Sequence, residues 1–210
     1  MLEDMLAAVT RADAVVRGLL DLSRVQELVL KENDLNEVVR NTLALVKHDS
    51  TVHHVRLVLD LEQGTLPVTM DRLRIQQVLI NLMTNAIHAM EGGGTLTVRT
   101  RRAEIPLAVG GPGEGTPPAH ARTDGVVIII EDTGPGIPPD ALDRIFEPFF
   151  TTKGAERGTG LGLPVSRQLV RMHRGSLTLD NMDHGARATV QLPLQLEGGD
   201  GVRHEAHSIG

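Results

Sequence analysis

Hydrophobic positions near the start of the chain follow a seven-residue repeat. Apolar residues recur at alternating steps of three and four, at Leu2, Met5, Val9, Ala12, Val16 and Leu19. This spacing is typical of a helix in a bundle or coiled coil. The repeat fades near residues 23–24, and no second long repeat follows in the chain. We therefore expect this helix to pair with a helix outside the chain; packing on its own domain is the alternative.

Two longer helical patterns follow. Asp34 and Glu37 have the spacing of a capping box, which predicts that a helix begins there, with an inner face of Leu35, Val38, Val39, Leu43 and Val46. Asp71 is predicted to cap the next helix, which should end at Gly92–Gly94. Its predicted inner face consists of Ile75, Val78, Leu79, Leu82, Ala86 and Met90. Shorter helices are expected near residues 139–145 and 163–173.

Alternating and β-branched runs predict the strands. They fall at residues 55–61, 96–100, 177–179 and 188–192, and the β-branched run Val126–Ile130 is typical of a strand buried on both faces. The stretch between Ala103 and Gly125 is rich in Gly and Pro and is predicted to be a long surface loop. These elements together predict an α+β fold, a two-layer α/β sandwich preceded by one long helix.

Composition narrows the class of protein. The formal net charge is -6, which disfavours a nucleic-acid partner. The chain has no Cys, so disulfides and thiolate metal sites are excluded. The longest purely apolar run, Val126–Ile130, is too short to cross a bilayer. We expect a soluble, cytoplasmic chain without membrane contact of its own, whether or not a longer parent protein is anchored in a membrane.

Polar residues on the helix after Asp71 are the first candidates for chemistry. Asn81 and Asn85 are one turn apart and His88 follows three residues later, so all three share one stripe opposite the apolar face. Two amides and an imidazole on a buried helix need partners. The stripe could equally be a solvated helix face.

Two Gly-containing segments provide further candidates. Asp132 follows the buried strand and precedes Gly134 and Gly136, which puts a carboxylate beside backbone that can approach a ligand, or else forms a simple turn. Further on, the run Gly158 to Gly162 precedes a helix, so its amides and the helix N-terminus can form an anion cradle. Its GxGxG spacing, without a preceding strand, excludes a dinucleotide fold, and no Gly-Lys-Ser/Thr follows for a P-loop.

In this order the segments resemble the sequence boxes of one family. The N box is Asn81–Ala86, the G1 box Asp132–Gly136, the F box Phe146–Phe150 and the G2 box Gly158–Gly162. Together they resemble the catalytic ATP-binding domain of bacterial sensor histidine kinases, with the Bergerat fold shared by gyrase, Hsp90 and MutL. The resemblance covers about residues 34–193.

The resemblance also implies a domain organisation. Residues 1–31 would be the second helix of a dimerisation and phosphotransfer bundle, because Leu19–Arg24 is similar to the end of that helix. Residues 32–196 would be the catalytic domain. Residues 197–210 are polar and would be a flexible tail.

ATP and Mg²⁺ are the cofactors that the resemblance implies. Asn85 would bind the Mg²⁺ on the ATP phosphates, with Asn81 supporting it and His88 near the phosphates. Asp132 would accept the adenine amino group and favour ATP over GTP. The other implied nucleotide-binding residues are Gly134, Gly136, Lys153 (a cation of the lid), Gly158, Thr159, Gly160, Leu161 and Gly162.

The three Phe residues of the chain, at positions 146, 149 and 150, fall in the segment that would be the ATP lid, between Asp132 and Gly158. Phe supplies a large buried area per residue at low entropy cost, so the cluster is predicted to act as a hydrophobic latch on this segment. A local cluster without a gating role is the alternative. The sequence departs from the family at Ala188, where Phe is often found.

Three functions are compatible with these boxes. They are transfer of phosphate from ATP to a His, ATP hydrolysis in a gyrase- or Hsp90-type clamp, and nucleotide binding in a non-catalytic dimerisation module. In the hydrolases a Glu one turn before the N-box Asn activates water; here Asn81 holds that position and cannot act as a base. Because every nucleotide-facing box carries the residues of the family pattern, a non-catalytic dimerisation module is disfavoured.

The resemblance therefore implies a protein-histidine kinase that forms a homodimer through its bundle and relays phosphate to a response regulator. None of the nine His residues begins the His-Glu/Asp-x-Arg/Lys box of the family's phosphoacceptor. We expect the acceptor to lie on a first bundle helix outside this chain. We also expect the chain to bind ATP without phosphorylating its own histidines.

Overall fold

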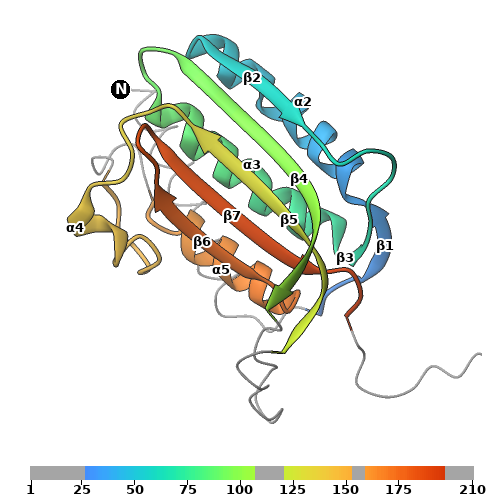
Figure 1. Ribbon diagram of the computed structural model, residues 1–210. Coiled ribbons are helices and arrows are strands. Elements are labelled where there is room, and N and C mark those ends of the chain that lie inside the picture. Colours follow the sequence, from blue (N-terminus) through green and yellow to red (C-terminus); the bar gives the residue numbers. More distant parts are fainter. Residues whose placement is uncertain (1–26, 107–120, 153–158, 197–210) are drawn as a thin grey trace, which may run out of the picture.

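The computed structural model describes residues 27–106, 121–152 and 159–196 (Figure 1). The predicted heptad helix, the polar tail, Lys153 and Gly158 lie outside these residues. Among the helices in the described part of the chain, none combines the length and apolar character needed to span a bilayer.

A five-stranded sheet and the helices on one of its faces form two layers (Figure 1). The strand order is β2-β4-β5-β7-β6, and only the β2–β4 pair is parallel. The strands are β2 (Val55–Asp60), β4 (Gly94–Pro106), β5 (Arg122–Asp132), β6 (Ser176–Asn181) and β7 (Ala186–Pro193). The helices are α2 (Leu35–Val52), α3 (Arg72–Ala89), the short α4 (Pro139–Leu142) and α5 (Gly162–Met172). The predicted α+β sandwich is confirmed.

A second, two-stranded sheet was not predicted. β1 (Lys31–Asp34) pairs antiparallel with β3 (Pro67–Met70), Lys31 lying opposite Met70. Each strand has four residues, and β1 reads Lys-Glu-Asn-Asp. Such a short polar strand shows no period-two alternation, so the sequence pattern carried no signal for it.

The inner faces predicted for α2 and α3 are confirmed, because every apolar residue assigned to them is buried. Only one half of the predicted capping box of α2 is confirmed. Asp34 accepts a hydrogen bond from the Asn36 N–H (3.0 Å), as expected for a cap. Glu37 does not reach back to it; its carboxylate binds Arg72, 3.0 Å away at the start of α3. A guanidinium supplied by another helix has replaced the local backbone partner.

The central strand is buried on one face only, which corrects the prediction for Val126–Ile130. Val126, Ile128 and Ile130 are buried beneath the helices, whereas Val127 and Ile129 are half-buried, because no helix of the described residues covers the other face. The predicted loop from Ala103 to Gly125 is also shorter than expected. β4 and β5 pair as far as Pro106 and Arg122, so both ends of that stretch are strand.

A buried histidine joins the end of α5 to the start of α3. The Asp71 N–H donates to Nε2 of His173 (3.0 Å), while Nδ1 of the same ring donates to the Leu169 carbonyl (2.7 Å). Burial lowers the pKa of His173 below its ordinary value, so the ring stays neutral and accepts from Asp71. The Asp71 carboxylate caps α3 through the Leu73 and Arg74 amides, as predicted. These bonds fix α5 against α3.

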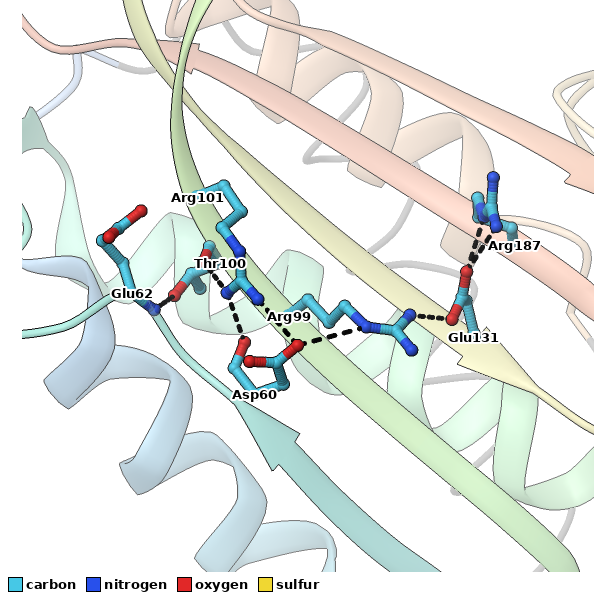
Figure 2. A network of polar contacts seen from close by, with 7 residues as sticks. All are labelled: Asp60, Glu62, Arg99, Thr100, Arg101, Glu131 and Arg187. Carbon is cyan, nitrogen blue, oxygen red and sulfur yellow. Dashed lines mark hydrogen bonds and ion pairs between the residues drawn. The ribbon is translucent and has the colours of Figure 1, made fainter.

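The helix-free face of the sheet carries a network of ion pairs across four strands (Figure 2). Asp60 on β2 accepts from Arg101 (2.7 Å) and lies 3.4 Å from Arg99, both on β4. Arg99 also pairs with Glu131 on β5. The other oxygen of Glu131 binds Arg187 on β7, 2.6 Å away. In the register of β4 and β5, Arg99 lies opposite Ile129 and Arg101 opposite Val127, so arginine stems flank the half-buried apolar residues of β5.

Glu131 is the central carboxylate of this network. Burial acts to raise its pKa, but hydrogen bonds and charge from Arg99 and Arg187 outweigh burial and lower the pKa overall. A carboxylate with a lowered folded-state pKa stabilises the fold in its ionised form.

We expect Glu131→Gln to lower the free energy of unfolding by about 1 kcal/mol at pH 7, because Arg187 loses its charged partner and Arg99 loses one of its two. The difference from the parent should hold above the unfolded-state pKa of about 4.3. It should be lost as the pH falls through the lower folded-state pKa. Urea unfolding across this range measures it, and Asp60→Asn, at the more exposed end of the network, should have a smaller effect. A pH-independent difference would contradict the ion-pair explanation.

Candidate active site

A cavity of about 400 Å³ lies between α3, the ends of β5 and β7, and the segment that leads into α5. Its lining includes Asn81, Asn85 and His88 from α3, Asp132 from β5, and Thr159, Gly160 and Gly162 from the glycine run. The volume falls in the range of small-molecule sites. The structure therefore brings three motifs that are far apart in the sequence around one cavity.

Asp132 lies at the apolar end of this cavity. It is 7% exposed, and its Oδ1 accepts hydrogen bonds from the N–H groups of Gly134 (2.9 Å) and Ala186 (3.2 Å). Burial raises the pKa of Asp132 above its ordinary value, although the two N–H bonds act against this. A buried carboxylate with directed acceptor atoms can recognise an amino group on a planar ligand.

Two residues that sequence analysis did not assign to a role shape this end of the cavity. Gly185 has φ +84°, and a Cβ atom there would lie 1.9 Å from the Asp132 carbonyl oxygen. Only glycine allows the turn before β7 to approach Asp132 this closely. Ala188, which departs from the family pattern, pairs with Ile130 and Leu179 and lines the cavity with a small side chain.

The polar end of the cavity is formed by α3 and the start of α5. Asn85 donates from Nδ2 to Oδ1 of Asn81, 3.3 Å away. Asn81 in turn donates to the buried hydroxyl of Ser166 on α5. The ring of His88 lies beside that of His53, with 5.1 Å between centroids. Ser166 is a further residue that sequence analysis missed, because an isolated Ser within a helix has no motif to mark it.

The glycines before α5 make room for other parts of the protein. A Cβ atom at Gly162 would lie 2.2 Å from Oδ1 of Asn81, and one at Gly160 would lie 2.4 Å from the Phe149 carbonyl carbon. The Phe149 N–H also donates to the Gly160 carbonyl (3.0 Å). These two glycines therefore bring the N box and the F box against the start of α5. Close approach of a nucleotide to the same backbone stays a prediction.

The three Phe residues do not form one buried cluster. Phe146 packs against the core with Arg167 over its ring (4.6 Å to the centroid), and Phe150 lines the cavity below Arg144 (4.4 Å). Phe149 is 56% exposed and has φ 67°. The latch prediction is therefore wrong for the Phe149 side chain, which the left-handed backbone turns outward; that segment contacts the site through its backbone instead.

Comparison with known proteins identifies the family. Residues 70–196 match the family described as "Histidine kinase-, DNA gyrase B-, and HSP90-like ATPase". This match covers more than half of the chain and includes all four boxes. The chain belongs to this family and carries the ATP-binding domain of a sensor histidine kinase.

Two relatives of this chain are named as sensor kinases. Sensor histidine kinase ZraS of Salmonella typhi is 34% identical over 185 residues, which is 88% of this chain and 36% of that protein. Sensor kinase CckA of Brucella abortus is 37% identical over 192 residues, 89% of this chain and 19% of that protein. The chain thus spans about a third or less of the length of these relatives.

Solved structures show the same fold. The nucleotide-free catalytic domain of histidine kinase ThkA superimposes with a TM-score of 0.64 at 28% identity, covering 80% of this chain and 99% of that domain. A longer ThkA chain, crystallised with the response regulator TrrA, gives a TM-score of 0.68 at 26% identity, covering 90% of this chain and 48% of that one.

We expect Asp132→Asn to leave the domain at least as stable as the parent at pH 7. The neutral amide keeps an oxygen for both N–H bonds and removes the cost of burying an ionised carboxylate. Since the folded-state pKa of Asp132 is raised, that cost is present above it and disappears below the unfolded-state pKa of about 3.9. Urea unfolding at several pH values, without nucleotide, measures the difference. A variant that is clearly less stable than the parent at pH 7 would contradict this interpretation.

Proposed function

We propose that this chain is the ATP-binding catalytic part of a protein-histidine kinase, which transfers the γ-phosphate of Mg-ATP to a His on a bundle helix. The observation that carries the proposal is the single cavity lined by Asn85, Asp132 and the glycine run before α5. Because the chain spans only part of its relatives, the activity of the whole protein belongs to the proposal.

The cavity has groups that fit each part of Mg-ATP. Asp132 offers a carboxylate for the adenine amino group at the apolar end. The oxygen of Asn85 is a ligand type that Mg²⁺ accepts, usually beside phosphate and water. The N-terminus of α5 lies at the cavity, and the preceding Leu161 has no polar side chain to cap it, so its amides suit an anion. Bound Mg-ATP would supply the phosphoryl group and the metal charge that neutralises it.

The remaining site residues have supporting roles in the proposal. His88 lines the cavity on the same stripe as Asn85 and would lie near the phosphates. Thr159 also lines the cavity and would contact the nucleotide. Lys153 would add a cation from the lid, by resemblance alone.

The acid–base groups of the site favour transfer over hydrolysis. Among the described residues that line the cavity, Asp132 is the one carboxylate, and it is bonded to two backbone N–H groups. Asn81, one turn before Asn85, is an amide and cannot take a proton from water. A site without a carboxylate beside the phosphates suits transfer to an acceptor that arrives with its own assisting group.

The partners follow from the same proposal. ThkA was crystallised with a response regulator, and we propose that this protein likewise passes its phosphate to the receiver domain of a response regulator. The bundle helix predicted before the catalytic domain would form a homodimer. The domain would work in the cytoplasm, with any membrane anchor outside this chain.

Asn85→Ala should weaken binding of Mg-ATP roughly 10- to 100-fold, the range seen when a metal site loses a supporting group. Binding of ATP in EDTA should change much less, because the lost atom contacts the metal. Isothermal titration calorimetry with and without Mg²⁺ measures both affinities. Asn41→Ala is the matched control, because Asn41 is a half-buried Asn on α2 whose Nδ2 donates to Glu37 (3.3 Å), away from the cavity. Full Mg-ATP affinity in Asn85→Ala would remove Asn85 from the site.

Labelled ATP tests the location of the acceptor. This chain alone should gain no acid-labile, base-stable phosphate, since none of its nine His residues begins an acceptor box. A separately purified dimeric bundle that carries such a His should become labelled when this chain is added. A phosphohistidine on the chain itself would contradict the prediction and place the acceptor among its own residues.

A further inference from the structure

A hydroxyl on α5 lies behind the two asparagines of the site. Ser166 is 2% exposed, and its Oγ is 2.9 Å from Nδ2 of Asn81, which belongs to a residue 85 positions earlier in the chain. Oδ1 of Asn81 then accepts from Nδ2 of Asn85 (3.3 Å). The helices α3 and α5 are in contact on the same side of the sheet (Figure 1). Three side chains from two helices therefore form a hydrogen-bonded series that ends at the cavity.

This series has a direction. A side-chain amide has a nitrogen that only donates and an oxygen that only accepts. With its nitrogen held by Ser166, Asn81 turns its oxygen toward Asn85. The nitrogen of Asn85 is held by that oxygen, so its own oxygen occupies the other branch of the amide. Oxygen can bind a cation, whereas an NH₂ group repels it, and the orientation of this amide determines which atom is presented.

We propose that Ser166 is a positioning residue for the Mg²⁺ site, which acts through Asn81 to keep the oxygen of Asn85 turned toward the metal. This inference rests on the proposed function, in which Asn85 binds Mg²⁺. Ser166 itself touches neither metal nor nucleotide.

The packing around Asn81 supports a fixed amide. A Cβ atom at Gly162, one turn before Ser166 on α5, would lie 2.2 Å from Oδ1 and 3.1 Å from Nδ2 of Asn81. The amide therefore fills the space left by the missing side chain, with its nitrogen within reach of the Ser166 hydroxyl. Shape alone does not distinguish the two ends of an amide, because oxygen and NH₂ have nearly the same size. The hydrogen bond that the Ser166 hydroxyl accepts from Nδ2 of Asn81 stabilises the observed orientation.

Removal of the hydroxyl has a specific consequence. Without it, the Asn81 amide can turn over, and its nitrogen would then face the nitrogen of Asn85. Two donors cannot bond each other, so Asn85 would turn over as well and present N–H groups to the metal. The cost should appear in Mg²⁺-dependent affinity and leave Mg²⁺-free affinity nearly unchanged.

The test is calorimetry of ATP binding to Ser166→Ala, once with Mg²⁺ and once with EDTA. We expect about a 2- to 12-fold loss of affinity with Mg²⁺, the range for one net hydrogen bond, and little change in EDTA. Ser166→Ala in an Asn81→Ala background should have no further effect, because the intermediate amide is gone.

A matched control separates positioning from general loosening of the domain. Thr42 on α2 is also fully buried and donates its hydroxyl to the Val38 carbonyl (2.8 Å), away from the cavity. Thr42→Val should alter unfolding in urea without altering the ratio of the two affinities. Ser166→Thr, which keeps a hydroxyl, should restore the parent's ratio.

The outcomes distinguish this inference from the proposed function. Equal losses with and without Mg²⁺ in Ser166→Ala would mean that Ser166 only joins two helices, and would overturn the inference. If Asn85→Ala loses Mg²⁺ dependence while Ser166→Ala keeps the parent's, the positioning role is wrong and the proposed function stands. If Asn85→Ala keeps full Mg-ATP affinity, the metal role of Asn85 fails, and the inference fails with it.

Discussion

The amide of Asn81 occupies the space that a side chain at residue 162 would fill, and the polar end of the site depends on this contact. It brings the N-box helix α3 against the first turn of α5, so the amides of the glycine run and the two asparagines reach one cavity. The pairing of His173 with Asp71 holds the other end of α5 at the start of α3. With both ends fixed, the position of the glycine run relative to Asn85 follows from helix packing, because packed interiors allow little sliding.

The apolar end of the site is stabilised differently. Asp132 is buried with a raised pKa, and the backbone of Gly185 closes around it with no room for a side chain. A buried carboxylate of this kind costs stability at neutral pH, and a site for a ligand amino group is a reason to keep it. The walls around it are Ile130, Leu179 and Ala188, so the carboxylate is the main polar feature that a planar ligand would meet there.

The two faces of the sheet are stabilised in different ways. Helices bury Val126, Ile128 and Ile130 on one face, and the chain has only three aromatic residues, all Phe, with which to cover the other. That face relies on cross-strand ion pairs instead, from Asp60 through Arg99 and Glu131 to Arg187 (Figure 2). Pairs between neighbouring strands contribute modestly one by one, but they share Asp60, Arg99 and Glu131 and so join four strands.

The sequence by itself determined the features that depend on local order. The apolar faces of α2 and α3, the caps at Asp34 and Asp71, and the four boxes all follow from spacing along the chain, because helical periodicity and capping act within a few residues. Only the tertiary structure determined which side chains pair, such as Ser166 with Asn81 and Arg72 with Glu37. It also determined the outward turn of Phe149 and the pairing of the short strands β1 and β3. These contacts join residues far apart in the chain, and no local pattern specifies which distant side chain will arrive beside a given residue. That is why the motifs of the site could be predicted, while the hydrogen bonds that orient its amides could not.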